Sequence, residues 1–218
     1  MLGLSDAGWV VGLVCAAVTT TAVLRGLSRY DHALGPADLV TLTRAMLACV
    51  VAALVADAFV EPPAVTVLVG ISVVALALDA VDGWVARWTG TASAFGARFD
   101  GEADAFLMLV LSVYVARSFG IWVLAIGLAR YVFGAAGWVL PWMAAQLPPR
   151  YWRKVVAATQ GVVLVVAASG VAPAPVSYAA LVFALALLVE SFGRDVLWLW
   201  RRRRPATREA RALAAGTP

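Results

Sequence analysis

Residues 64–88 read AVTVLVGISVVALALDAVDGWVARW, and this stretch carries no charge before Asp79. A helix needs about 20 predominantly apolar residues to cross the hydrocarbon core of a bilayer. Apolar stretches of this kind recur from one end of the chain to the other, at residues 7–24, 39–60, 64–88, 103–116, 121–143, 152–169 and 176–200. The sequence therefore predicts an all-α integral membrane protein with seven spans.

The composition agrees with a membrane protein. Of the 218 residues, 63% are hydrophobic and 14% are charged, whereas a soluble domain has about 25% charged residues. Cys15 and Cys49 lie apart inside apolar stretches, and His32 is the only histidine of the chain. Neither a disulfide framework nor a zinc site of cysteines and histidines is expected, so a metal site would have to use carboxylates.

The basic residues predict the orientation in the membrane. With seven spans, one side of the bilayer collects Arg25, Arg29, Arg87, Arg98, Arg150, Arg153, Lys154 and residues 201–204. The other side has Arg117, with Asp57 and Glu61 nearby. Because basic loops stay in the cytoplasm, we expect a multi-pass protein of the cell membrane with its basic side in the cytoplasm. Residues 201–204 suit anionic lipid headgroups better than nucleic acid.

Four aspartates lie near the ends of two predicted helices. Asp79 and Asp82 are three residues apart, Asp100 and Asp104 are four apart, and each pair shares one helix face. A charged residue deep in a span costs about 2.5–3.5 kcal/mol, and four carboxylates close together repel one another. Two divalent cations would cancel the four charges, and carboxylates prefer hard ions such as Mg²⁺ or Mn²⁺. The alternative is that these acids are solvated at the membrane boundary.

The residues around the aspartates sharpen the prediction. Gly83 would let a ligand approach the backbone, and Arg87 could pair with a phosphate. The full string is Asp79-x2-Asp82-Gly83-x2-Ala86-Arg87-x8-Gly96-x3-Asp100-x3-Asp104. This string resembles the signature of the CDP-alcohol phosphatidyltransferases, with every spacing intact.

The resemblance implies a fold and a reaction. It implies a six-helix membrane domain at residues 35–204, preceded by an extra transmembrane helix and linker at residues 1–34 and followed by a flexible cytoplasmic tail at residues 205–218. The reaction moves a phosphatidyl group from CDP-diacylglycerol to an alcohol, with release of CMP. The implied metal ligands of two Mg²⁺ or Mn²⁺ ions are Asp79, Asp82, Asp100 and Asp104. Asp104 is in addition the implied general base.

The resemblance also implies residues that line the nucleotide. These are Asp38, Thr41, Gly83, Ala86, Arg87, Ser93 and Gly96. Asp38 and Thr41 belong to a second match at residues 36–44, which resembles the Pro-Asn-x-(Ile/Leu/Val)-Thr-x-x-Arg motif of the family. Asp38 replaces the usual asparagine there, and it is also a candidate cap of the helix that follows.

The acceptor is predicted less directly. Arg130 lies within the apolar stretch at residues 121–143, and a buried arginine in a span indicates function. The acceptor-binding residues that the resemblance implies are Arg44, Arg130, Arg153, Lys154 and Gln160. They favour glycerol 3-phosphate or an inositol phosphate, although Val156 replaces a lysine that such enzymes carry. Serine, a second lipid or an unusual polyol stay open, and a homodimer is implied weakly.

Two other classes of protein remain. A carboxylate-lined cation transporter, or another metal-binding membrane protein without catalysis, would explain the four acids. It would give no reason for Gly83, Arg87 and Gly96 at their spacings. A degenerate member of the family that acts as a scaffold would not need the intact aspartates.

Overall fold

The structure is a computed structural model that describes residues 4–30, 35–89, 93–145, 147–148 and 150–215. For residues 29, 30, 36, 37, 80, 82–89, 94 and 203–215 it describes the helical backbone and not the side chains. These described parts form seven α-helices and two short 3-10 helices, and they contain no strand. The prediction of an all-α protein is confirmed.

Each predicted apolar stretch corresponds to one helix or one helical region. The helices are α1 (Asp6–Tyr30), α2 (Pro36–Asp57), α3 (Val65–Thr89), α4 (Ala94–Phe119), α5 (Leu124–Val139), α6 (Tyr151–Ser169) and α7 (Ala174–Ala215), with η1 (Ile121–Val123) and η2 (Pro141–Met143) flanking α5. Four segments of the described chain are long and apolar enough to cross a membrane, Asp6–Ser28, Asp38–Asp57, Ile121–Val139 and Ala174–Arg202. The chain is therefore a multi-pass membrane protein.

Two helices differ in length from the prediction. Helix α4 begins at Ala94, well before the predicted apolar stretch at residues 103–116, because Ser93 caps it by accepting a hydrogen bond from the Gly96 N–H (2.8 Å). Helix α7 continues to Ala215, into the segment that we predicted as a flexible tail. Residues 206–215 read ATREARALAA, a composition rich in strong helix formers.

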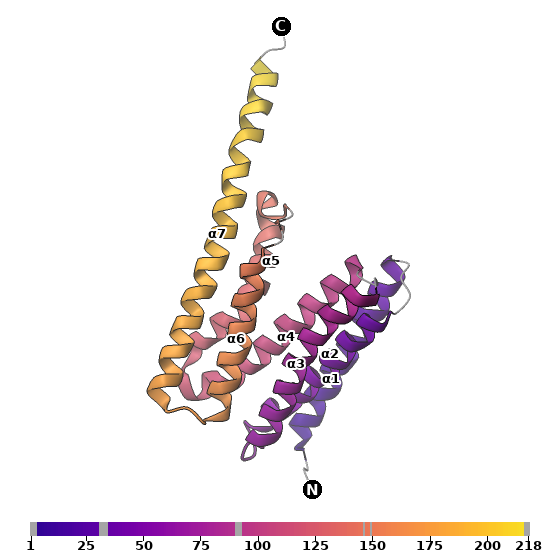
Figure 1. Ribbon diagram of the computed structural model, residues 1–218, viewed down its shortest axis with the longest axis vertical. Helices are drawn as coiled ribbons and strands as arrows, with labels where there is room; N and C mark the ends of the chain where they lie inside the picture. Colours follow the sequence, from indigo (N-terminus) through magenta and orange to yellow (C-terminus); the bar gives the residue numbers. More distant parts are fainter. Residues whose placement is uncertain (1–3, 31–34, 90–92, 146, 149, 216–218) are drawn as a thin grey trace.

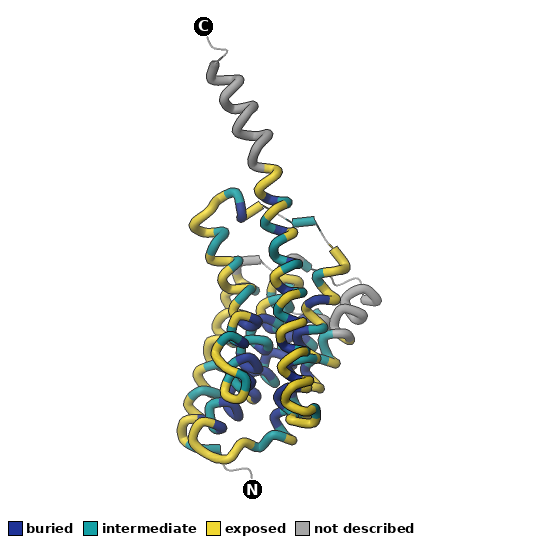
Figure 2. The backbone as a smooth tube through the Cα atoms, turned by 90° about the vertical axis from the view of Figure 1, so that its left-hand side faces the viewer, coloured by how far each residue is buried: buried dark blue, intermediate teal, exposed yellow. Residues whose placement is uncertain are grey.

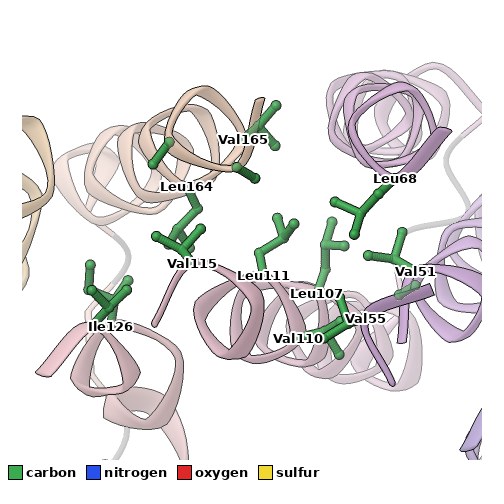
Figure 3. Packing of buried hydrophobic residues seen from close by; sticks show 14 of the residues in the cluster. Val51, Val55, Leu68, Leu107, Val110, Leu111, Val115, Ile126, Leu164 and Val165 are labelled. Carbon is green, nitrogen blue, oxygen red and sulfur yellow. The ribbon is translucent and has the colours of Figure 1, made fainter. Parts of the chain in front are cut away.

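Helix α4 holds the bundle together. On one side, α4 packs against α2, and α2 in turn packs against α3. On the other side, α4 packs against α5 and α6, and α6 packs against α7. Figure 1 shows α4 crossing between the group of α1, α2 and α3 and the group of α5, α6 and α7. The hydrophobic core is centred on α4 (Figure 3), where Leu107, Leu111 and Val115 meet Val51 of α2 and Leu164 of α6.

The outer surface of the bundle is apolar as well. Large hydrophobic side chains are exposed on several helices, among them Val14 of α1, Trp138 of α5 and Phe183 of α7. Figure 2 shows the buried residues gathered inside the bundle and the exposed ones outside. Such a surface suits contact with lipid tails, in which helices associate by close packing rather than by exclusion of water.

The extra N-terminal helix packs on α2 through small residues. Gly8 and Gly12 form a Gly-x-x-x-Gly pair, and a Cβ atom at Gly12 would lie 3.0 Å from the Ala53 Cβ. Small residues at this spacing let two membrane helices approach closely. The Ser5 N–H also donates a hydrogen bond to the Asp57 carboxylate (2.7 Å), which ties the start of α1 to the end of α2.

Candidate functional site

Three of the four predicted metal ligands meet in space. Asp79 comes from α3, and Asp100 and Asp104 come from successive turns of α4. One carboxylate oxygen of each lies within 4.8 Å of the others, and all three residues are half-buried. Oxygen atoms at this separation fit a hard divalent cation, whose oxygen ligands lie about 2.0–2.6 Å from the ion. As the spacing of four residues predicted, Asp100 and Asp104 lie on the same face of α4, and this face meets Asp79 of α3.

The fourth predicted ligand falls outside the described side chains. Asp82 lies one turn after Asp79 in α3, and its side chain is not among those described. The same holds for Gly83, Ala86 and Arg87. The roles of these four residues stay predictions.

Arg44 of α2 lies among the carboxylates. Its Nη2 is 2.9 Å from the Asp79 Oδ1 and its Nη1 is 2.5 Å from the Asp100 Oδ1. Nη2 also donates to the Asp104 Oδ1. The side chain is 3% exposed, so it stabilises the acidic cluster from inside the bundle. One guanidinium against three carboxylates leaves two negative charges, and Asp82 would add another, so the cluster keeps the charge that a divalent cation requires.

The predicted role of Arg44 as an acceptor-binding residue is not tested by this placement. Sequence reasoning missed its contacts with the aspartates. A signal was present, because Arg44 lies near the start of the stretch at residues 39–60, on the predicted side of the membrane that carries the aspartates.

Three of the predicted nucleotide-binding residues, Asp38, Ser93 and Gly96, lie together where α2 meets α4. Asp38 and Thr41 are buried near the start of α2, and the Asp38 Oδ2 accepts a hydrogen bond from the Gly35 N–H (2.9 Å). A Cβ atom at Gly96 would lie 2.9 Å from the Asp38 Oδ1 and 3.1 Å from the Ser93 Oγ. Gly96 is therefore needed for the approach of the two helices. Asp38 caps α2 from inside its first turn, and its nucleotide contact stays a prediction.

A cavity of about 440 Å³ opens beside the carboxylate cluster. Residues of α4, α5, α6 and α7 line it, and Asp104 is one of them. The predicted acceptor-binding residues Arg130, Arg153 and Gln160 also line the cavity. Of the other two, Arg44 lies in the carboxylate cluster, and Lys154 is exposed on α6 and is not among the described lining residues.

Both arginines of the cavity have carboxylate partners. The Arg130 Nη2 is 3.2 Å from the Glu102 Oε1, and a Cβ atom at Gly101 would lie 2.7 Å from that same nitrogen. Gly101 therefore makes room for the guanidinium against α4. The Arg153 Nη1 is 3.8 Å from the Asp195 Oδ2, and its Nη2 donates to the Pro148 carbonyl oxygen.

The inner wall of the cavity is polar and buried. Gln160 is 3% exposed and Asp195 is 4% exposed. The Gln160 Nε2 donates to the Ala184 carbonyl oxygen (2.7 Å), while the Gln160 Oε1 has no hydrogen-bond partner among the described residues. Sequence reasoning missed Asp195 and Ser191. Their spacing of four residues inside an apolar helix was the available signal, because it puts two polar side chains on one face.

Half-buried carboxylates beside a cavity within a helical membrane bundle define a membrane protein with a candidate cation-dependent catalytic centre. The CDP-alcohol phosphatidyltransferase family model matches residues 35–190 of the chain. The match covers more than half of the chain, and the chain belongs to this family. No curated protein and no solved structure matches it.

Membership of the family makes the chain a phosphotransferase that transfers a phosphatidyl group from a CDP-alcohol. The matched residues include the aspartates of α3 and α4, the whole of α4, α5 and α6, and the first part of α7 up to residue 190. Ser191 and Asp195, which line the cavity, lie just beyond the match. Helix α1 lies outside the match. The match favours the enzyme over the cation transporter, which shares the carboxylates but not the family.

Proposed function

We propose that this protein transfers the phosphatidyl group of CDP-diacylglycerol to an alcohol and releases CMP. The observation that carries the proposal is the position of Asp104. Its carboxylate belongs to the acidic cluster and also lines the cavity. One residue thus joins a group of carboxylates that could hold a metal ion with a cavity in which we propose that the acceptor alcohol binds.

The proposed metal ligands are Asp79, Asp82, Asp100 and Asp104, which would hold two Mg²⁺ or Mn²⁺ ions. Such ions, when bound, neutralise phosphate charge and favour departure of the CMP group. The close oxygen atoms of Asp79, Asp100 and Asp104 support this assignment. Arg44 keeps the three carboxylates together by contacting each of them.

The chemical step needs a base at the acceptor hydroxyl. In the proposed reaction, the acceptor oxygen forms a bond to the phosphorus atom that carries the diacylglycerol group. The bond between this phosphorus and the oxygen of CMP breaks, and CMP leaves with the electron pair. Asp104 takes the hydroxyl proton, because among the described carboxylates of the cluster it is the one that lines the cavity.

The nucleotide is proposed to lie along the starts of α2 and α4. Asp38, Ser93 and Gly96 are already close together there, and Thr41 is buried near the start of α2. Gly83, Ala86 and Arg87 follow the aspartates of α3. The positive-inside distribution of basic residues supports a cell-membrane protein whose site faces the cytoplasm. A homodimer stays a prediction.

The test is CMP release from CDP-diacylglycerol labelled in the cytidine, with purified full-length protein and a panel of acceptor alcohols. We expect release that requires Mg²⁺ or Mn²⁺ and is lost on chelation. An Asp100→Asn variant should be inactive, whereas Glu61→Gln, which removes an exposed carboxylate from the α2–α3 loop, should behave as wild type. No CMP release with any acceptor and either ion would overturn the proposal and favour a transporter.

A further inference from the structure

Helix α1, which lies outside the family match, has one packed side and one exposed side. The exposed side carries large apolar residues such as Trp9, Leu13 and Val18. The residues of the packed side follow one another at intervals of three or four, which keeps them on one helix face. They are Gly8, Gly12, Cys15, Thr19, Val23 and Gly26. This face seats α1 on α2 and α4.

The two ends of the packed face meet different helices. Gly8 and Gly12 lie against Ala53, near the end of α2. Gly26 lies against Phe95, the second residue of α4. A Cβ atom at Gly26 would lie 2.3 Å from the Phe95 Cε2 and 3.0 Å from its Cδ2, whereas carbon atoms in contact are about 3.5–4.0 Å apart. The Phe95 ring is buried, so it can keep its position only with glycine at residue 26.

Phe95 lies in the turn of α4 that carries two of the proposed nucleotide-binding residues. Ser93 caps this turn by accepting a hydrogen bond from the Gly96 N–H (2.8 Å). Gly96 lies against Asp38 of α2, where a Cβ atom would be 2.9 Å from the Asp38 Oδ1. The Phe99 ring stacks on the Phe95 ring one turn later. The first turn of α4 is therefore held by α2 through Gly96 and by α1 through Phe95.

The carboxylates further along α4 are held by a different contact. Asp100 and Asp104 both contact Arg44 of α2. Their positions therefore have a support that does not involve α1. A change at the contact between Gly26 and Phe95 should act on the nucleotide end of the site before it acts on the carboxylates.

We propose that α1 braces the part of the site that binds the cytidine diphosphate group of the donor. Gly26 fixes the Phe95 ring, and the ring fixes the first turn of α4. Ser93 and Gly96 then lie where the nucleotide meets them. This inference rests on the proposed transferase function and gives α1 a part in donor binding. Gly26 and Phe95 are positioning residues, since neither contacts the donor in this arrangement.

The test is the Gly26→Ala variant of the purified full-length protein, assayed with CDP-diacylglycerol, Mn²⁺ and the acceptor that gives the fastest CMP release. We expect KM for CDP-diacylglycerol to rise about tenfold, the ratio that 1.4 kcal/mol produces. CMP, measured by equilibrium binding, should bind more weakly by a similar factor. The acceptor KM and kcat should stay nearly unchanged, because Arg44 still holds the carboxylates.

The matched control is Gly12→Ala in the same helix. Its new Cβ would lie 3.0 Å from the Ala53 Cβ, away from the start of α4. It should lower Tm and leave KM for CDP-diacylglycerol unchanged. A helix that only anchors or stabilises the protein would give both variants a lower Tm and a donor KM equal to that of wild type.

A second substitution shows whether the effect passes through the Phe95 ring. Leucine at residue 95 has no ring edge to meet the new Cβ, and substitutions that act through one contact do not add. In a Phe95→Leu background, Gly26→Ala should therefore raise the donor KM by at most about twofold. Phe95→Leu alone introduces no clash and should itself raise the donor KM about threefold or more, the ratio that about 0.65 kcal/mol produces.

The outcomes separate this inference from the proposed function. If wild type releases CMP and both Gly26→Ala and Phe95→Leu keep the wild-type donor KM and CMP affinity, the brace is refuted and the transferase function stands. An equal rise in donor KM from Gly12→Ala, or a full tenfold rise from Gly26→Ala in the Phe95→Leu background, would refute it as well. Absence of CMP release from wild type with every acceptor would remove the proposed function and the inference together.

Discussion

Arg44 offers the sharpest test of the acidic cluster, because it is the buried cation that contacts three carboxylates at once. Replacing Arg44 with Met keeps an unbranched side chain, shorter than that of arginine, and removes its charge. Loss of one partner from a buried ion pair costs about 3–5 kcal/mol. The carboxylates are 31–43% exposed, so water screens them in part and we expect the lower limit, about 3 kcal/mol.

The assay is thermal unfolding of the purified protein in detergent, with and without Mn²⁺. For a chain of this size, about 3 kcal/mol corresponds to a fall in Tm of about 6–12 °C. Mn²⁺ at 100 times its Kd stabilises a folded protein by about 2.7 kcal/mol. We expect Mn²⁺ to stabilise the Arg44→Met variant more than wild type, because the ion then replaces the missing positive charge.

The matched control is Arg25→Met, which removes an exposed arginine of α1. Surface substitutions usually change the free energy of unfolding by at most about 0.5 kcal/mol. The control should therefore change Tm by less than about 2 °C. The reasoning would be refuted if Arg44→Met unfolded at the temperature of wild type in EDTA and gained no more than wild type from Mn²⁺.

Three further predictions concern the proposed base Asp104, the packing of α5 against α4, and the exposed Lys154. Asp104→Asn should abolish CMP release and leave binding of CDP-diacylglycerol largely intact, as measured by equilibrium binding; activity near that of wild type would exclude Asp104 as the base. Gly127→Ala should destabilise the protein by about 1–3 kcal/mol in thermal unfolding, because the new Cβ would lie 2.6 Å from the Leu109 Cα. The control Gly134→Ala, whose new Cβ would meet no atom within 4 Å, should not destabilise the protein. Lys154→Gln should leave the acceptor KM unchanged, because Lys154 is exposed and is not among the described residues that line the cavity. A large rise in KM would support its predicted role at the acceptor.

The sequence predicted the helices and the acidic cluster well because both depend on local patterns. Apolar length locates each helix, and the spacing of Asp100 and Asp104 puts both on one face of α4. The start of α4 was missed because residues 94–102 are partly charged, and hydropathy does not register a cap such as Ser93.

The ion pairs were not predictable from the same patterns. Arg44 and the three aspartates belong to three different helices, and Arg153 and Asp195 belong to two more. Periodicity gives the face on which a side chain lies and does not say which helix that face meets. Contacts of this kind depend on packing, to which Gly96 and Gly101 contribute by allowing close approach.

The central claim is that carboxylates from α3 and α4 hold divalent metal ions next to the acceptor cavity. An experimental structure of the protein with Mn²⁺ and CDP-diacylglycerol would test it most directly, with the ions located by their anomalous scattering. The account predicts Mn²⁺ bound by Asp79, Asp100 and Asp104, with the pyrophosphate of the donor beside the ions. Mn²⁺ bound elsewhere, with these three carboxylates turned apart, would contradict it.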